Sequence, residues 1–110
     1  MANIEEIERR TNVALAAIKQ AAAGVSYSVD LFTSHHLQEL EPAYWQQHTG
    51  TPRPNREQIL DLLELRSHWG KKDKNGVDVF DFTLPDGVTN YVISVELNDA
   101  GEVKDISMDS

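Results

Sequence analysis

Hydrophobic residues recur at helical spacing near the start of the chain. When residues 3–23 are drawn as a helix, one face is apolar from end to end. Asn3 and Glu6 form a capping-box-like pair at its start, and Gly24 is a natural stop. The pattern therefore predicts a helix over residues 3–23 with one face toward the core. That face consists of Ile4, Ile7, Ala14, Leu15, Ile18 and Ala22.

The pattern changes to a period of two in the next segment. Hydrophobic residues alternate with small or acidic ones in VSYSVDLF, residues 25–32. Strict alternation over this length is typical of a half-buried strand, so we expect one early strand here. Its inward residues would be Val25, Tyr27, Val29 and Leu31.

Proline and glycine divide the middle of the chain into short pieces. Pro42 disfavours helix just before it and suits the first position of a new one, so we expect a short turn at 34–40 and a helix from Pro42 to Gly50. Asn55 and Gln58 predict another capping box, followed by a stripe that includes Ile59 and Leu63. Residues 67–76, SHWGKKDKNG, carry two glycines and three lysines and favour an exposed loop.

Three strand-like runs end the chain, at residues 77–84, 91–97 and 102–108. The turn signals PDG and NDAG separate them, which predicts an antiparallel meander. We therefore expect one α+β domain over residues 1–110. It would contain an N-terminal helix, one early strand, further short helices and a C-terminal three-stranded antiparallel meander with helices on one face.

Alternation also predicts which side chains the sheet turns away from the helices. If Phe80, Phe82 and Leu84 face the helices, Asp81 faces away. The same alternation assigns Ile106 and Met108 inward and Lys104 to the helix side, but a slip of one residue in the last strand would invert this assignment. The carboxylates expected on the helix-free face are Asp81, Glu96, Asp105 and Asp109.

The negative charge is concentrated at this end of the chain. The net charge is −8, and residues 75–110 contain eight acids against one basic residue, Lys104. Such a surface repels nucleic acid and anionic lipid, so neither is an expected partner, whereas a basic protein is. The plainer interpretation is that the acids mainly aid solubility. The lack of cysteine, of a long apolar run and of a signal-peptide pattern favours a cytoplasmic location.

Few residues indicate catalysis. His36 and Glu39 could share a helix face and supply two metal ligands, with His35 beside them, but no further ligands follow at metal-site spacing. No cysteine, nucleophile elbow or glycine-rich phosphate loop is present. We therefore expect no catalytic residues, no metal and no cofactor. The alternative is a small hydrolase or metal-dependent enzyme that uses His35, His36 and nearby acids.

The two tryptophans flank turn or linker segments. We expect Trp45 and Trp69 to close the core, each with its indole nitrogen bonded to a nearby carbonyl. The alternative is that one of them anchors an interface, because tryptophan is enriched at binding hot spots.

The C-terminal motifs resemble a known family. LELRSHWG, VDVFDFTLPDGVTNYVISV and the terminal ISMDS are similar to a pattern in small bacterial proteins that share a domain of unknown function, in which a DVFDF strand, an NYVISV strand and an acidic I-x-M-x-S tail occur in this order. The resemblance covers about residues 28–110. It implies a bacterial α+β domain without an established activity, and residues 3–23 would then be a variable addition.

These expectations favour a non-catalytic, cytoplasmic protein-interaction domain. Small acidic α+β proteins of bacteria include immunity proteins that neutralise cationic toxins, a likeness of size and charge only. The specific hypothesis is an inhibitor that binds a basic partner through Asp81, Glu96, Asp105 and Asp109. A homodimer, paired through an edge strand or a sheet face, is a further alternative.

Overall fold

The computed structural model describes residues 4–23, 27–70 and 77–109, which form an α+β arrangement of helices and one antiparallel sheet. Strand order in the sheet is β1-β2-β3-β4, so each strand pairs with its neighbour along the chain. The elements are α1 (Ile4–Ala23), α2 (Tyr27–Glu39), α3 (Pro42–Thr49), α4 (Arg56–Leu60), β1 (Glu64–Trp69), β2 (Val79–Thr83), the 3₁₀ turn η1 (Pro85–Gly87), β3 (Val92–Leu97) and β4 (Val103–Asp109).

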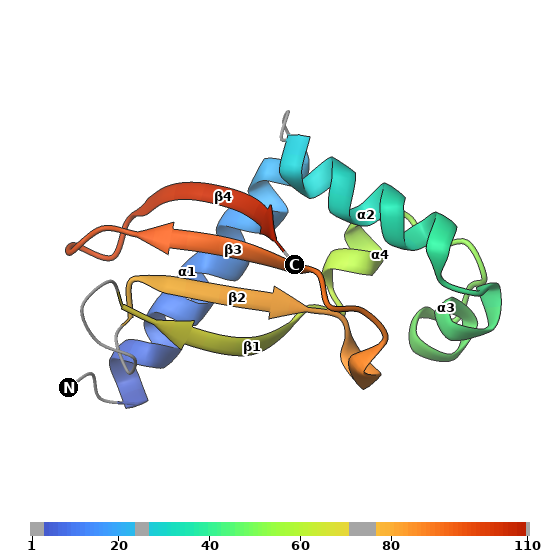
Figure 1. Cartoon of the computed structure of the whole chain (residues 1–110), viewed down its shortest axis with the longest axis horizontal. Coiled ribbons are helices and arrows are strands. Elements are labelled where there is room, and N and C mark those ends of the chain that lie inside the picture. Colours follow the sequence, from blue (N-terminus) through green and yellow to red (C-terminus); the bar gives the residue numbers. More distant parts are fainter. Residues whose placement is uncertain (1–3, 24–26, 71–76, 110) are drawn as a thin grey trace.

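Helices cover only one face of the sheet. Figure 1 shows α1 running behind the four strands, while α2, α3 and α4 gather toward one end of the sheet. The opposite face carries no helix of the described residues, and we call it the open sheet face. The core lies between the helices and the covered face. Its fully buried members include Ala14, Ile18, Val29, Phe32, Phe80, Phe82, Ile93 and Val95.

The N-terminal helix agrees with its prediction. Ala14 and Ile18 are buried, and Ile7 and Leu15 pack against the core cluster. Ile4 departs from the pattern, since it is 73% exposed at the first turn of α1. The predicted cap Asn3 and stop Gly24 lie outside the described residues.

A buried arginine fastens α1 to the sheet. Arg10 donates from Nη1 to the Val77 carbonyl at 2.8 Å and from Nη2 to the Asp99 carbonyl at 3.0 Å. Its Nε donates to Glu6 Oε1 at 2.6 Å. A guanidinium holds its donors in a fixed fork, so this one side chain joins the helix to the start of β2 and to the β3–β4 turn.

The predicted early strand is wrong. Residues 27–39 form α2, which buries Val29, Phe32 and His36. Those positions follow i, i+3 and i+7, so the period-two alternation hid a helical stripe. Leu31, predicted inward, is exposed. Residues 25 and 26 lie outside the described part of the chain.

The predicted turn at 34–40 is likewise helical as far as Glu39, where α2 ends. Residues 40 and 41 are not helical and separate α2 from the proline that starts α3. Pro42 takes the first helical position there, and Gly50 closes α3 in the left-handed conformation, as predicted.

A fourth strand replaces part of the predicted helix and loop. The capping box of Asn55 and Gln58 is confirmed, but α4 ends at Leu60. Residues 64–69 form β1, so the sheet has four strands among the described residues rather than three. Arg66 is an extra residue in the pairing, because Leu65 lies opposite Phe82 and Ser67 opposite Asp81. This bulge removes the alternation that would have indicated a strand. Residues 71–76 of the predicted loop lie outside the described part.

The predicted register of the last three strands is confirmed. Asp81 lies opposite Ser94, and Glu96 lies opposite Asp105. The predicted side of Lys104 is wrong. Leu97 pairs with Val103, which makes Lys104 an extra residue in β4, and its Nζ lies 3.2 Å from Glu96 Oε2. A bulge directly after the turn thus reverses one side chain without shifting the rest of the strand.

Candidate functional site

A polar row crosses the centre of the open sheet face. Ser67, Asp81, Ser94 and Ser107 lie directly opposite one another on four successive strands. Residues paired in this way point to the same side of a sheet. We call these four residues the serine–aspartate row.

All four carboxylates predicted for this face lie on it. Asp81 belongs to the serine–aspartate row, and Glu96 and Asp105 face each other in the neighbouring row. Asp109 lies opposite Val92 at the end of β4. The structure therefore brings together side chains from three strands, although Lys104 forms an ion pair with Glu96 and relieves part of the like-charge repulsion.

The central carboxylate is held in place by neighbouring donors. Ser94 Oγ donates to Asp81 Oδ1 at 2.6 Å, and the indole nitrogen of Trp69 donates to Oδ2 at 3.4 Å. At the rim, Ser107 Oγ donates to Asp109 Oδ2 at 3.2 Å. An ionised carboxylate can accept about four hydrogen bonds, so Asp81 keeps capacity for a further donor.

The two tryptophans have different environments. Trp45 is 1% exposed and belongs to the core, as predicted. The expected hydrogen bond from its indole nitrogen is wrong, because Nε1 has no partner among the described residues. Trp69 is 43% exposed, so its predicted core position is also wrong. It lies opposite Val79 in the row of Glu96 and Asp105. The sequence would have placed Trp69 on this face only if residues 64–69 had been predicted to form a strand.

The histidines lie at a second, separate surface. A cleft of about 420 Å³ separates α2 from residues 87–91, and His35, His36, Glu39 and Tyr91 are among the residues that line it. The His35 ring packs edge-on against Tyr91, with centroids 5.1 Å apart. Tyr91 and Thr89 were not predicted here, because they are distant in sequence from α2 and follow no chemical motif.

His36 is a poor candidate for a base or a metal ligand. It is 1% exposed, and both ring nitrogens are engaged: Nδ1 with the Phe32 carbonyl at 2.7 Å and Nε2 with Thr89 Oγ1 at 2.9 Å. Burial lowers the pKa of His36 below its ordinary value of 6.5. Within the described ranges, no group of three or more histidine, aspartate or glutamate side chains is placed to hold a metal ion.

Zinc titration would test the expected lack of a metal site. We expect calorimetry on untagged protein to find no single sub-micromolar site, because Nε2 of the buried His36 would have to give up its bond from Thr89 and the described residues place no cluster of ligands there. Protein with His36 replaced by phenylalanine is the control for weak binding elsewhere. A tight single site that this replacement abolishes would contradict the prediction and favour the enzyme alternative.

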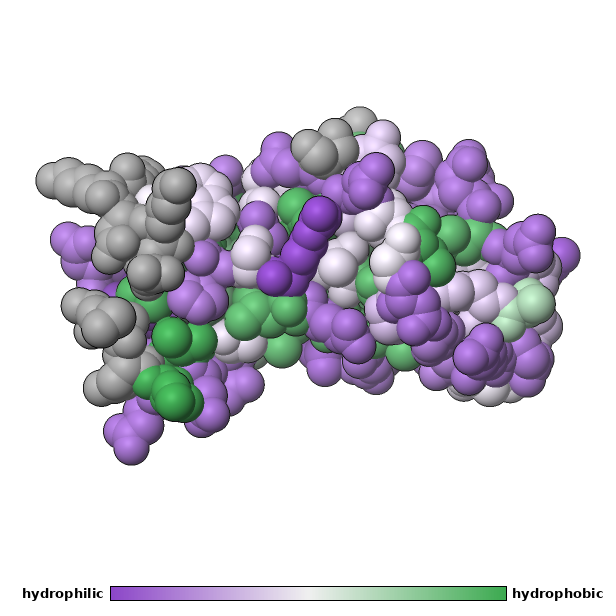
Figure 2. All heavy atoms as spheres, turned by 60° about the horizontal axis from the view of Figure 1, so that its bottom comes forward, coloured by the Kyte–Doolittle hydropathy of each residue, from purple (hydrophilic) through white to green (hydrophobic). Residues whose placement is uncertain are grey.

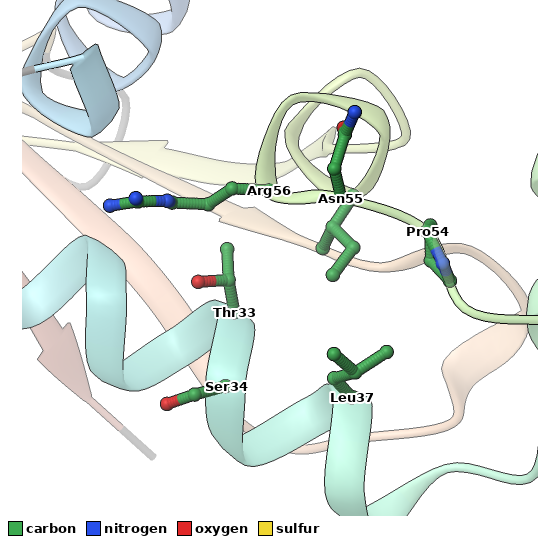
Figure 3. Close-up of a pocket in the computed structure, with 7 residues that line it drawn as sticks. Thr33, Ser34, Leu37, Pro54, Asn55 and Arg56 are labelled. Atoms are coloured by element: carbon green, nitrogen blue, oxygen red, sulfur yellow. The ribbon is translucent and has the colours of Figure 1, made fainter.

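A smaller cleft of about 200 Å³ lies between α2 and residues 54–59. Figure 3 shows Leu37 on one side of it, while the Asn55 side chain points away. Asn55 is occupied as the cap of α4. The hydroxyls of Thr33 and Ser34 donate to carbonyls of their own helix, and Arg56 pairs with Asp30. The polar groups that line this cleft thus already have partners.

Two further findings bear on function. No helix within the described ranges combines the length and apolar character that a membrane span requires. Comparison with known proteins finds no family model, no curated protein and no solved structure that matches the chain.

Proposed function

We propose that this chain is a non-catalytic protein-interaction domain that binds a basic partner through the open sheet face. Within that class, we propose an inhibitor of the immunity-protein type. The observation that carries the proposal is the pairing of β2, β3 and β4, which gathers Asp81, Glu96, Asp105 and Asp109 on a face that no described helix covers.

The charge of this face supports a basic partner. Glu96 and Asp105 lie opposite each other, and the ion pair of Glu96 with Lys104 relieves only part of this like-charge placement. A cationic partner would offset the remaining repulsion on binding. It would also be steered toward the face, because the chain carries a net charge of −8. Association should therefore slow as salt rises.

The hydrogen bonds of Asp81 support a role for its carboxylate in orienting the partner. Ser94 and Trp69 fix its carboxylate before any partner arrives, so little side-chain freedom is lost on binding. Trp69 adds a large, partly exposed aromatic surface beside Asp81. Tryptophan is among the residue types most enriched at binding hot spots. Figure 2, in which the β1 edge of the sheet comes forward, shows mainly hydrophilic residues with small hydrophobic areas between them.

The enzyme alternative has less support. It needs His36 as a base or ligand, and both nitrogens of that buried ring are already hydrogen-bonded. His35 packs against His36 and Tyr91. The Thr89 hydroxyl lies 2.9 Å from His36 Nε2, but that ring is buried and its Nδ1 bonds to a backbone carbonyl rather than to an orienting carboxylate.

Neutralising the open sheet face should abolish partner capture. The test variant replaces Asp81, Glu96 and Asp105 together with Asn, Gln and Asn. Immobilised parent protein is exposed to lysate of the source cells, and each captured protein is identified. We expect the parent to capture a basic protein that the variant loses, because the charges that steer and orient it are gone. Thermal unfolding checks that the variant still folds.

A charge-matched control distinguishes the effect of this face from the effect of a lower net charge. Replacing Glu8, Glu41 and Glu57 with glutamine removes the same three charges from exposed positions on the helical side of the chain. This control should capture the partner as the parent does. Failure of the parent to capture any basic protein, or equal capture by parent and face variant, would show that the acids serve solubility alone.

A further inference from the structure

The hydrogen bonds of His36 have one allowed direction. The Phe32 carbonyl can only accept, so Nδ1 must carry the proton that it shares with it. Nε2 of the neutral ring is then an acceptor, and the Thr89 hydroxyl must donate to it. Thr89 Oγ1 in turn accepts from the Tyr91 backbone N–H at 3.1 Å. An ordered chain of donors thus runs from Tyr91 through Thr89 and His36 to α2.

We propose that His36 is a proton-controlled latch, which holds residues 87–91 on α2 while its ring is neutral and releases them when the ring gains a second proton. The proposal goes beyond partner binding by the open sheet face and does not depend on it. The latch consists of the His36–Thr89 bond and the Thr89–Tyr91 bond behind it.

A second proton would disrupt this arrangement at one atom. The proton would occupy Nε2, so Nε2 could no longer accept from Thr89. Thr89 Oγ1 has two lone pairs and would accept from both Nε2–H and the Tyr91 N–H, but its own hydroxyl hydrogen would lose its acceptor. The new charge would also lie in a ring that solvent hardly reaches. Releasing the loop would let water reach both groups.

The surroundings of His36 favour the neutral ring. Burial is the largest cause of its lowered pKa, the bond to Phe32 opposes the shift, and His35 adds to it. The other titratable groups around the cleft are Glu39 on α2 and Tyr91 before β3, whose ring centroid lies 5.9 Å from that of His36.

Release should stay local, because other side chains also hold the loop. Thr83 Oγ1 donates to the Tyr91 carbonyl at 2.9 Å, and Arg66 Nη1 reaches the Asn90 carbonyl at 3.4 Å. Neither bond involves a group that titrates near neutral pH. Protonation would therefore free the side of the loop that faces α2 and leave its contacts with β1 and β2. The cleft between α2 and the loop would widen.

The pH dependence has a definite sign. The folded pKa of His36 lies below its unfolded value, so the unfolded or released state binds the proton more readily. The latched state is fully favoured above the ordinary histidine value of 6.5 and loses that advantage as the pH falls toward the folded pKa.

Nuclear magnetic resonance can follow the ring and the loop together. A titration from about pH 8 to about pH 5 would record the ring nitrogens of His36 and the backbone amides of Thr89 and Tyr91. We expect Nδ1–H as the neutral tautomer, protonation below pH 6.5, and amide shifts at Thr89 and Tyr91 with the same midpoint as the ring.

Two matched variants complete the test. Thr89→Val removes the hydroxyl at nearly constant volume. It should raise the pKa of His36 and give released-type Tyr91 shifts even at neutral pH, because the latch is absent. Thr83→Val removes one of the two loop bonds that do not involve His36 and should leave the His36 midpoint unchanged. If Thr89→Val fails to fold, Thr89→Ser keeps the hydroxyl and should titrate as the parent does. The proposal is overturned if His36 protonates while Thr89 and Tyr91 keep their shifts, or if those amides follow His35 instead.

Discussion

Replacement of Phe82 by alanine is expected to lower the free energy of unfolding by about 3–5 kcal/mol, the usual cost of truncating a buried aromatic in a packed core. Phe82 is 0% exposed and lies in β2, opposite Leu65 on β1 and Ile93 on β3. Its removal would leave a cavity bordered by three strands and by the helices behind them, which cannot easily collapse.

Urea denaturation of parent and variant would measure this loss. Phe82→Leu is the matched control, because it keeps most of the apolar volume and should cost only about 1–2 kcal/mol. A loss below about 1 kcal/mol for the alanine variant would mean that the core relaxes around β2 more freely than interior packing allows.

Loss of the Arg10 guanidinium should be the second large effect. Arg10→Ala leaves the Val77 and Asp99 carbonyls without their charged donor, and hydrogen bonds to charged groups contribute about 1.5–3 kcal/mol each. Part of this loss is recovered by water at the exposed Asp99, so we expect a total of about 2–3 kcal/mol. Arg10→Lys should recover little, because an ammonium cannot span both carbonyls.

The neighbouring residue provides the control for charge. Arg9 also pairs with Glu6, but its side chain is half exposed. Arg9→Ala removes the same charge from the same helix turn and should change the unfolding midpoint far less than Arg10→Ala. Equal effects of the two substitutions would mean that the charge near Glu6 matters and the clamp on the sheet does not.

Local patterns predicted the elements whose stability is local. The stripe of Ala14 and Ile18, the Asn55 capping box and the alternation in β3 each depend on spacing within one segment. The register of the open sheet face followed from these alternations and from the Gly101 turn, where φ is 83°. Four carboxylates on one face could therefore be placed from the sequence.

The errors arose where tertiary contacts decide. Val29 fits a strand or a helix equally well by its neighbours, and only packing against α1 and the sheet selects α2. Bulges at Arg66 and Lys104 break alternation, which hid β1 and put Lys104 on the wrong side. The His36–Thr89 bond joins residues 53 positions apart, a contact that no local spacing reveals.

The two bulges also affect the exposed edges of the sheet. β1 and β4 are its outer strands, and each carries one extra residue, Arg66 or Lys104. Both extra residues are exposed cations. An outer strand that is interrupted by a bulge carrying an exposed charge is a poor template for another strand, since the free amide and carbonyl groups no longer form an even ladder. Concentrated solutions of this protein should therefore resist the edge-to-edge growth that leads to fibres, and dimerisation through an outer strand is disfavoured.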